Sequence, residues 1–154
     1  MKQAESLWFK GTLAKIRLGL AQGRTDLAII EQWLPYGESP PLHIHRNEDE
    51  IFLMIEGTMR FVVGGKEIVA RAGDTLLAPK EVPHTFRVES PEGAHCFTIT
   101  TGSDFEKLVR AFGSPALSDE LPPPMEPTPE MIEALTRTCR ENGIDIVGPP
   151  LAGT

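Results

Sequence analysis

The sequence predicts a mainly β fold, an antiparallel barrel or sandwich followed by two short α-helices. Short apolar runs recur from about residue 12 to residue 101, and turn residues, above all glycine, separate them. No stretch with helical periodicity lies between these runs, which argues against an alternating α/β sheet. The pair Gly64-Gly65 joins two runs at the length of a tight hairpin. We therefore expect residues 1–154 to form a single domain whose barrel core spans about residues 12–101.

The limits of the expected strands follow from side-chain alternation and from the turn residues between the runs. Residues two apart on a strand face the same side of the sheet, so each run divides into an inward and an outward set. The segment Ala72-Gly73-Asp74, for example, marks a corner between two strands. We expect strands at residues 12–18, 27–33, 42–45, 50–56, 58–63, 67–71, 74–78, 84–88 and 94–101.

The helices are expected in a C-terminal extension of about residues 103–147. The first begins at a capping-box pattern, Ser103-x-x-Glu106, and runs to about Phe112. The second runs from about Pro129 to Asn142 and ends before a glycine. Because both helices are amphipathic, we expect them to pack on the outer sheet of the barrel.

Three of the four histidines and one carboxylate fall on a regular spacing within the strands. The spacing reads Gly37-x5-His43-x-His45-x4-Glu50-x6-Gly57, then Gly73-x5-Pro79-x4-His84. His43 and His45 lie two apart on one expected strand, so their imidazoles face the same side. Glu50 follows His45 by an odd number of residues, so the chain must turn and return Glu50 on a neighbouring strand. His84 begins a third strand, and the pattern predicts a metal site inside the barrel.

The donor set restricts the metal. Imidazoles and a carboxylate suit one divalent transition metal ion per chain, namely Fe, Mn, Ni, Co, Cu or Zn. A tetrahedral zinc ion would be saturated by these four ligands, whereas an octahedral ion would keep positions for water, substrate or dioxygen. Glu48 and Asp49 remain alternatives to Glu50 as the carboxylate ligand. The fourth histidine, His95, lies in a later apolar run, and we expect it in the core or in support of a ligand.

Alternation also predicts the wall beside the metal. Phe52 and Met54 share the face of Glu50, and Phe86 and Val88 share the face of His84. These four side chains would form an apolar substrate pocket that excludes water. Each of them could equally fill the core of a small barrel.

The two metal-site motifs resemble those of the cupins over residues 37–57 and 73–88. This resemblance implies an antiparallel double-stranded β-helix, the jelly-roll or cupin barrel. The second motif departs from the family at Glu81, where a glycine is usual, and at Val88, where an asparagine is usual. Since a glycine there commonly serves a backbone with positive φ, we expect the turn at Glu81 to be reshaped.

A further resemblance, to the single-domain quercetin dioxygenase-like cupins, extends through residues 7–12 and 143–150. It implies a metal-dependent dioxygenase acting on a flavonol-like, enediol or aromatic small molecule, with Glu50 as the catalytic residue that accepts the substrate proton or shifts away from the ion. One alternative is a non-redox metal-dependent isomerase, lyase or decarboxylase, and another is a non-enzymatic small-molecule binder or sensor. Because cupins commonly pair through their outer sheets, we also expect a homodimer, with residues 27–30 and Trp33 as a possible surface.

Composition narrows the partners and the location. The chain has 15 Lys and Arg against 22 Asp and Glu, a net charge of -7, so nucleic acid is not an expected partner. The first residues lack the apolar stretch of a signal peptide, and no run reaches membrane-spanning length, so we expect no membrane association and a cytoplasmic location. Cys96 and Cys139 are expected to pack as free thiols rather than to form a disulfide.

Overall fold

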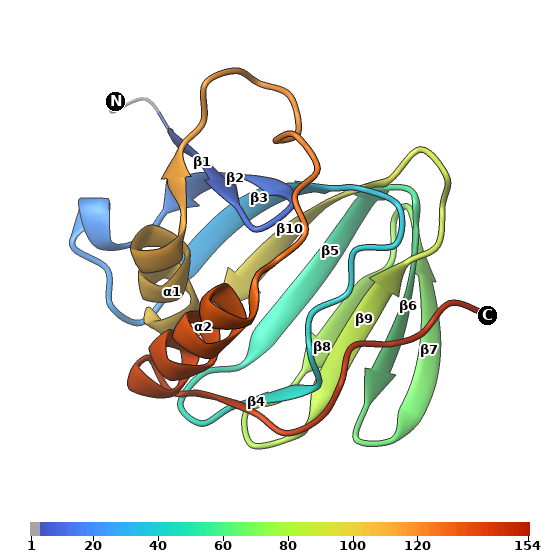
Figure 1. Cartoon of the computed structure of the whole chain (residues 1–154). Helices are drawn as coiled ribbons and strands as arrows, with labels where there is room; N and C mark the ends of the chain where they lie inside the picture. Colours follow the sequence, from blue (N-terminus) through green and yellow to red (C-terminus); the bar gives the residue numbers. More distant parts are fainter. Residues whose placement is uncertain (1–3) are drawn as a thin grey trace.

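The computed structural model describes residues 4–154, which form two antiparallel sheets that face each other, with α-helices at one side (Figure 1). The first sheet has the order β11 (Ser114–Pro115), β1 (Glu5–Phe9), β2 (Thr12–Leu18), β3 (Ala28–Leu34), β10 (Ala94–Thr100), β5 (Glu50–Glu56) and β8 (Thr75–Ala78). The second has the order β12 (Ile144–Ile146), β4 (His43–His45), β9 (His84–Val88), β6 (Thr58–Val63) and β7 (Lys66–Arg71). The mainly β jelly-roll prediction is confirmed.

Each strand expected from the sequence is present, with its ends displaced by at most one residue. The hairpin at Gly64-Gly65 is also present, and both glycines have positive φ. Strands β1, β11 and β12 were not expected. Strand β1 pairs with β2 through a turn at Lys10 and Gly11, and β12 extends the second sheet by pairing with β4.

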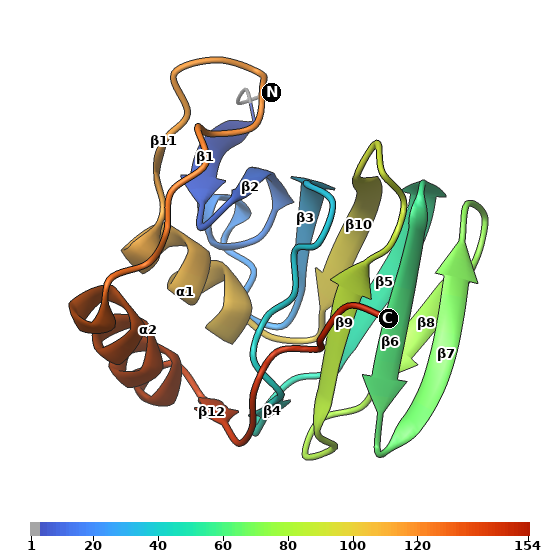
Figure 2. The same ribbon diagram turned by 45° about the vertical axis from the view of Figure 1, so that its right-hand side comes forward.

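The helices α1 (Asp104–Phe112) and α2 (Pro129–Glu141) match the predicted ranges, but their predicted position on the outer sheet is wrong. Leu108 of α1 and Cys139 of α2 pack in one buried cluster with Ile16 of β2 and Ile30 of β3. Ile16 and Ile30 are paired across the two strands, and they lie on the inward face of the first sheet. Figure 2 shows the helices over β1 and β2, beside the second sheet. They therefore cover the part of the inner face that the second sheet leaves open.

The predicted capping box of α1 is also wrong. The Ser103 side chain makes no capping hydrogen bond. Glu106 points away from the helix start, and its carboxylate accepts hydrogen bonds from the Leu20 amide and the Arg110 guanidinium. The amide groups of the first turn find an acceptor in another segment of the chain. The N-cap of α2 does form, because Thr128 Oγ1 accepts a hydrogen bond from the Met131 amide.

The closed end of the barrel is filled by a buried aromatic and aliphatic cluster. The rings of Phe52, Phe61 and Phe86 lie with centroids 4.9 to 5.7 Å apart. Met54 and Val88 belong to the same cluster and have exposed fractions of 1% and 0%. The packing leaves the other end of the inner face, between the sheets and the helices, for a site.

The turn at Glu81 is not reshaped to avoid a left-handed residue. Glu81 itself adopts φ 67, the conformation that a glycine would take without steric cost. Its amide donates a hydrogen bond of 2.8 Å to the carbonyl oxygen of His45. The turn thereby connects the start of β9 to the end of β4, where two of the predicted metal ligands lie.

Among the helices of residues 4–154, none combines the length and the apolar character that crossing a membrane requires.

Candidate metal centre

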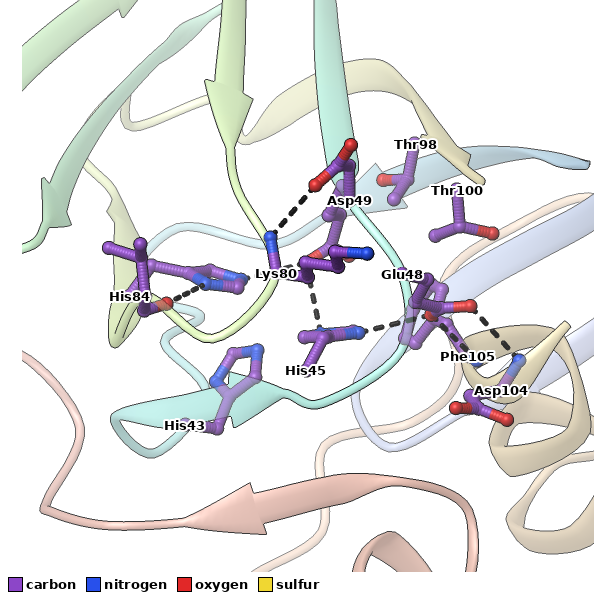
Figure 3. A network of polar contacts seen from close by, with 12 residues as sticks. His43, His45, Glu48, Asp49, Lys80, His84, Thr98, Thr100, Asp104 and Phe105 are labelled. Carbon is purple, nitrogen blue, oxygen red and sulfur yellow. Dashed lines mark hydrogen bonds and ion pairs between the residues drawn. The ribbon is translucent and has the colours of Figure 1, made fainter. Parts of the chain in front are cut away.

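The four predicted ligands lie together at the open end of the barrel. His43 and His45 belong to β4, Glu50 begins β5 and His84 begins β9. One nitrogen or oxygen atom from each of these residues lies within 4.8 Å of the others, so the group could hold a metal ion. His43 stands directly opposite His84 in the register of β4 and β9. Figure 3 shows the three imidazoles gathered beside the loop that leads to β5.

The turn between β4 and β5 decides which carboxylate joins the cluster. Asp49 faces away, because its Oδ1 accepts a hydrogen bond from the Lys80 amide and its amide donates to Thr101 Oγ1. Glu48 contacts the outer nitrogen of His45 rather than the centre of the cluster. Glu50 is left with its Oε2 atom 2.8 Å from His84 Nε2 and 3.2 Å from His45 Nε2. These contacts leave Glu50 as the carboxylate of the cluster, and its two acidic neighbours support the turn.

Each imidazole is held through Nδ1, which leaves Nε2 for the centre. His43 Nδ1 lies 2.7 Å from the Pro41 carbonyl oxygen, and His84 Nδ1 lies 3.2 Å from the Val82 carbonyl oxygen. Carbonyl oxygens only accept hydrogen bonds, so Nδ1 of these two rings carries the proton. His45 Nδ1 lies 3.0 Å from Glu48 Oε2. Buried histidines fixed in this way fit a divalent metal ion, which needs neutral, correctly oriented imidazole nitrogens.

The electrostatics of the metal-free cluster are dominated by Glu50. Burial would lower the pKa of His45, but the charge of Glu50 and the hydrogen bonds that His45 donates to Glu48 and Glu50 outweigh it and raise this pKa to about 10. Burial would raise the pKa of Glu50, but the two adjacent histidines keep it well below its ordinary value. Burial and the charge of His84 lower the pKa of His43 to about 3. Without a metal ion, a proton on His45 therefore balances the Glu50 carboxylate.

A cavity adjoins the cluster, and its wall is mostly apolar. Phe52 and Phe86 line it as the sequence predicted, but Met54 and Val88 do not, since they lie deeper in the core. The cavity provides about 80 Å³ for the centres of water molecules, several times the space that one water needs. Its walls therefore leave room beside the predicted ligands for a molecule other than the protein.

Much of the wall comes from elements whose position sequence reasoning missed. Phe105 and Leu108 of α1, and Leu135 and Cys139 of α2, line the cavity because the helices cover the inner face. The apolar stripes on both helices were visible in the sequence, but nothing in the stripes identified the face they would cover. The remaining apolar lining comes from Phe9, Leu34, Pro40, Pro41, Ile144 and Ile146.

Some of the residues that line the cavity are polar. Lys10 in the turn between β1 and β2 forms an ion pair of 3.4 Å with Glu38, and both side chains line the cavity. Gln32 of β3 also lines it, and its amide donates to Thr98 Oγ1 at 2.6 Å.

His95 is neither a core residue nor a support for a ligand. It lies on the outer face of the first sheet, where its ring stacks on Trp33 with centroids 4.5 Å apart. Its Nε2 atom lies 2.7 Å from Glu31 Oε1. Alternation along β10 explains the outcome, because His95 has the opposite parity to the buried Cys96. As expected, Cys96 and Cys139 are both free and buried.

Comparison with known proteins identifies the class of the domain. A family model described as Cupin domain matches residues 31–100. Over 87 residues the chain is 26% identical to the quercetin 2,3-dioxygenase of Bacillus subtilis (strain 168). That match covers 56% of this chain and 26% of the enzyme, so the chain spans about a quarter of the length of this curated relative.

Solved structures agree on the fold. An RmlC-like cupin from Shewanella frigidimarina NCIMB 400 matches with a TM-score of 0.54 and 22% identity, covering 64% of this chain and 84% of that chain. A structure described as a predicted oxalate decarboxylase from Thermotoga maritima matches with a TM-score of 0.54 and 20% identity, covering 65% and 92%. The chain thus carries a cupin domain at residues 31–100 and resembles the quercetinase-like cupins. The named activities of these proteins differ, and fold alone does not choose between them.

Proposed function

We propose that the protein is a metal-dependent dioxygenase acting on a small aromatic or enediol substrate, with His43, His45, Glu50 and His84 as the ligands of one divalent ion. The observation that carries the proposal is the cluster of three imidazoles and one carboxylate, half-buried at His43 and otherwise buried, that borders an apolar cavity. Similarity to a quercetin 2,3-dioxygenase supports this choice among cupin activities.

A divalent ion at this place would lower the pKa of a substrate hydroxyl and keep the reacting oxygen atoms in position. The chain's own contribution to proton transfer is Glu50. Its Oε2 atom lies within hydrogen-bond distance of two imidazoles and faces the centre, so it is placed to accept the hydroxyl proton. The adjacent His45 and His84 keep the pKa of Glu50 well below its ordinary value, so the carboxyl is ionised and can accept a proton.

The cavity wall favours an aromatic substrate over a carbohydrate. Phe52, Phe86 and Phe105 line the cavity together with the ligand cluster, and apolar residues make up most of the wall. Aromatic rings pack well against such walls and displace water from the reacting atoms. The pair formed by Lys10 and Glu38 would meet the polar end of a substrate whose hydroxyl groups reach the metal ligands.

Oxygen consumption tests the proposal. Protein loaded in turn with Fe(II), Mn(II), Co(II) or Ni(II) should consume oxygen in the presence of a flavonol or an enediol. Glu50→Gln should lower the rate by about 100-fold or more, because a positioned base contributes at least that factor. The control is Glu56→Gln, at the exposed end of the same strand, which should leave the rate unchanged.

Two outcomes of this experiment would contradict the proposal. Absence of oxygen uptake with every metal and substrate would count against any dioxygenase activity. Turnover of a substrate at an equal rate without oxygen would instead indicate a non-redox isomerase, lyase or decarboxylase.

We also propose that the protein forms a homodimer through the outer face of the first sheet. Ile51 of β5 lies between Leu77 of β8 and Ile99 of β10 on that face, and Leu77 is 53% exposed. Within residues 27–30 the surface is smaller than predicted, because Ala28 and Ile30 face inward and are buried. An apolar sheet face of this kind favours a symmetric pair. Light scattering should give twice the mass of one chain, and Leu77→Lys should give the mass of one.

A further inference from the structure

Glu48 is a fully buried carboxylate that is not one of the four predicted metal ligands. It lies in the loop between β4 and β5, and its exposed fraction is 0%. Its Oε2 atom lies 3.0 Å from His45 Nδ1 and accepts a hydrogen bond of 3.1 Å from the Phe105 amide. Its Oε1 atom accepts a hydrogen bond of 3.0 Å from the Asp104 amide. Figure 3 shows the carboxylate between the imidazole and the start of α1.

The start of α1 explains how the chain tolerates this buried charge. The first amide groups of a helix have no partner within the helix, and the helix dipole favours a negative charge beside them. Ser103 does not supply the capping oxygen, so the Glu48 carboxylate takes that place from a distant segment. Gly102 allows the close approach, because a Cβ atom there would meet Glu48 Oε1 at 3.0 Å.

His45 differs from the other two histidines of the cluster in how it is oriented. His43 and His84 are held by backbone carbonyl oxygens, whereas His45 is held by a side chain. A carboxylate bonded to the outer nitrogen of a ligating histidine fixes the ring, keeps the inner nitrogen available and increases its basicity. Glu48 is thus placed to act on the centre through His45.

We propose that Glu48 is a positioning residue that orients His45 for metal binding and couples the metal centre to α1. The inference rests on the proposed metal site. The same carboxylate holds both the imidazole and the first turn of the helix, and Phe105 in that turn lines the cavity and lies 6.3 Å, centroid to centroid, from the His45 ring. Fixing His45 on a metal ion therefore also fixes the cavity wall formed by α1.

Substitution of Glu48 by glutamine separates this role from simple packing. The amide keeps the size of the carboxylate but has one acceptor oxygen for three donors, namely His45 Nδ1–H and the amides of Asp104 and Phe105. If the glutamine NH2 group turns to His45, Nδ1 must accept, and the proton moves to Nε2, which then cannot ligate. If it turns to the helix, the helix start loses an acceptor.

Glu106 of α1 offers a matched control for the Glu48 substitution. Glu106 is also 0% exposed and is held by Leu20 and Arg110, away from the three histidines. Glu106→Gln should change the thermal stability of the protein and leave its affinity for Mn(II) unchanged. Glu48→Gln should weaken Mn(II) binding by about tenfold to a hundredfold, the usual effect of losing a partner of a ligating histidine.

The affinities are measured by competition with a chelator on folded protein. An affinity of Glu48→Gln equal to that of the wild type would overturn the inference while leaving the metal site intact. Failure of the wild type itself to bind any divalent transition metal would instead overturn the proposed metal site, and with it this role.

Hydrogen exchange on the wild type provides a second test that does not depend on how the variant folds. Addition of Mn(II) or Zn(II) should slow exchange of the Asp104 and Phe105 amides, because the coupled carboxylate becomes fixed. The Met131 amide at the start of α2 is capped by Thr128 and should not change. Equal exchange at Asp104 and Phe105 with and without bound metal would contradict the coupling.

Discussion

Replacement of His84 by alanine should lower the affinity for Mn(II) or Co(II) by at least about 100-fold, more than the loss of a residue that only supports a ligand. His84 is 0% exposed, stands opposite His43 and approaches Glu50 within 2.8 Å. Its removal leaves two imidazoles and one carboxylate, which bind a divalent ion more weakly than four ligands do. Calorimetric titration of the metal-free protein measures the change directly.

His95→Ala is the matched control for this substitution. His95 contacts Glu31 and Trp33 on the outer face and does not line the cavity. The His95→Ala variant should therefore bind the metal with the affinity of the wild type. A wild-type affinity in His84→Ala, with circular dichroism showing a folded protein, would remove His84 from the ligand set.

The affinity for the metal should rise about tenfold for each unit of pH between about pH 7 and about pH 9. In the metal-free protein the pKa of His45 is raised to about 10, so His45 carries a proton throughout this range. A metal ion must displace that proton to reach Nε2. His43, whose pKa is lowered to about 3, is already neutral and releases none.

The same shift has a consequence for stability. A histidine whose folded pKa lies above its ordinary value of about 6.5 stabilises the protein fully below that value, and the stabilisation is lost as the pH rises towards the folded pKa. The metal-free protein should thus lose stability from about pH 7 to about pH 9, whereas the metal-bound protein should not.

Calorimetry of metal binding in buffers of different ionisation enthalpy should detect about one proton released per metal ion bound. An affinity independent of pH would contradict a protonated His45.

The ligand cluster could be predicted from the sequence because strand parity is local. His43 and His45 face one side of β4 by alternation, and the odd spacing to Glu50 requires the turn that the structure contains. The choice of Glu50 over Glu48 and Asp49, by contrast, could not be predicted from the spacing, because it depends on tertiary contacts with Thr101 and α1.

The pocket could be predicted only in part. Alternation places Phe86 and Val88 on the same face as His84, but it does not indicate depth. At about 3.3 Å per residue, Val88 lies about 13 Å along β9 from His84, well into the closed end of the barrel. The same distance separates Met54 from Glu50, which is why Phe52 and Phe86 line the cavity and the two residues beyond them fill the core.

Two features could not be predicted from the sequence: the cavity wall formed by α1 and α2, and the contact of Glu48 with His45. An amphipathic stripe such as that of α1 indicates that one face of the helix is buried. The surface against which this face packs depends on the path of the chain after β10. Ser103 and Glu106 match a local capping pattern, but the amide of Asp104 donates instead to Glu48, which lies far away in the sequence. Strand β12 is only three residues long and forms because β4 offers an open edge.

Elemental analysis can establish whether His43, His45, Glu50 and His84 hold one divalent transition metal ion, as we propose. The wild-type protein is purified without chelators, with His84→Ala prepared in parallel. We expect about one equivalent of a transition metal per wild-type chain and much less in the variant. Equal metal content in the two proteins, or background content in the wild type even after incubation with each candidate ion, would contradict it.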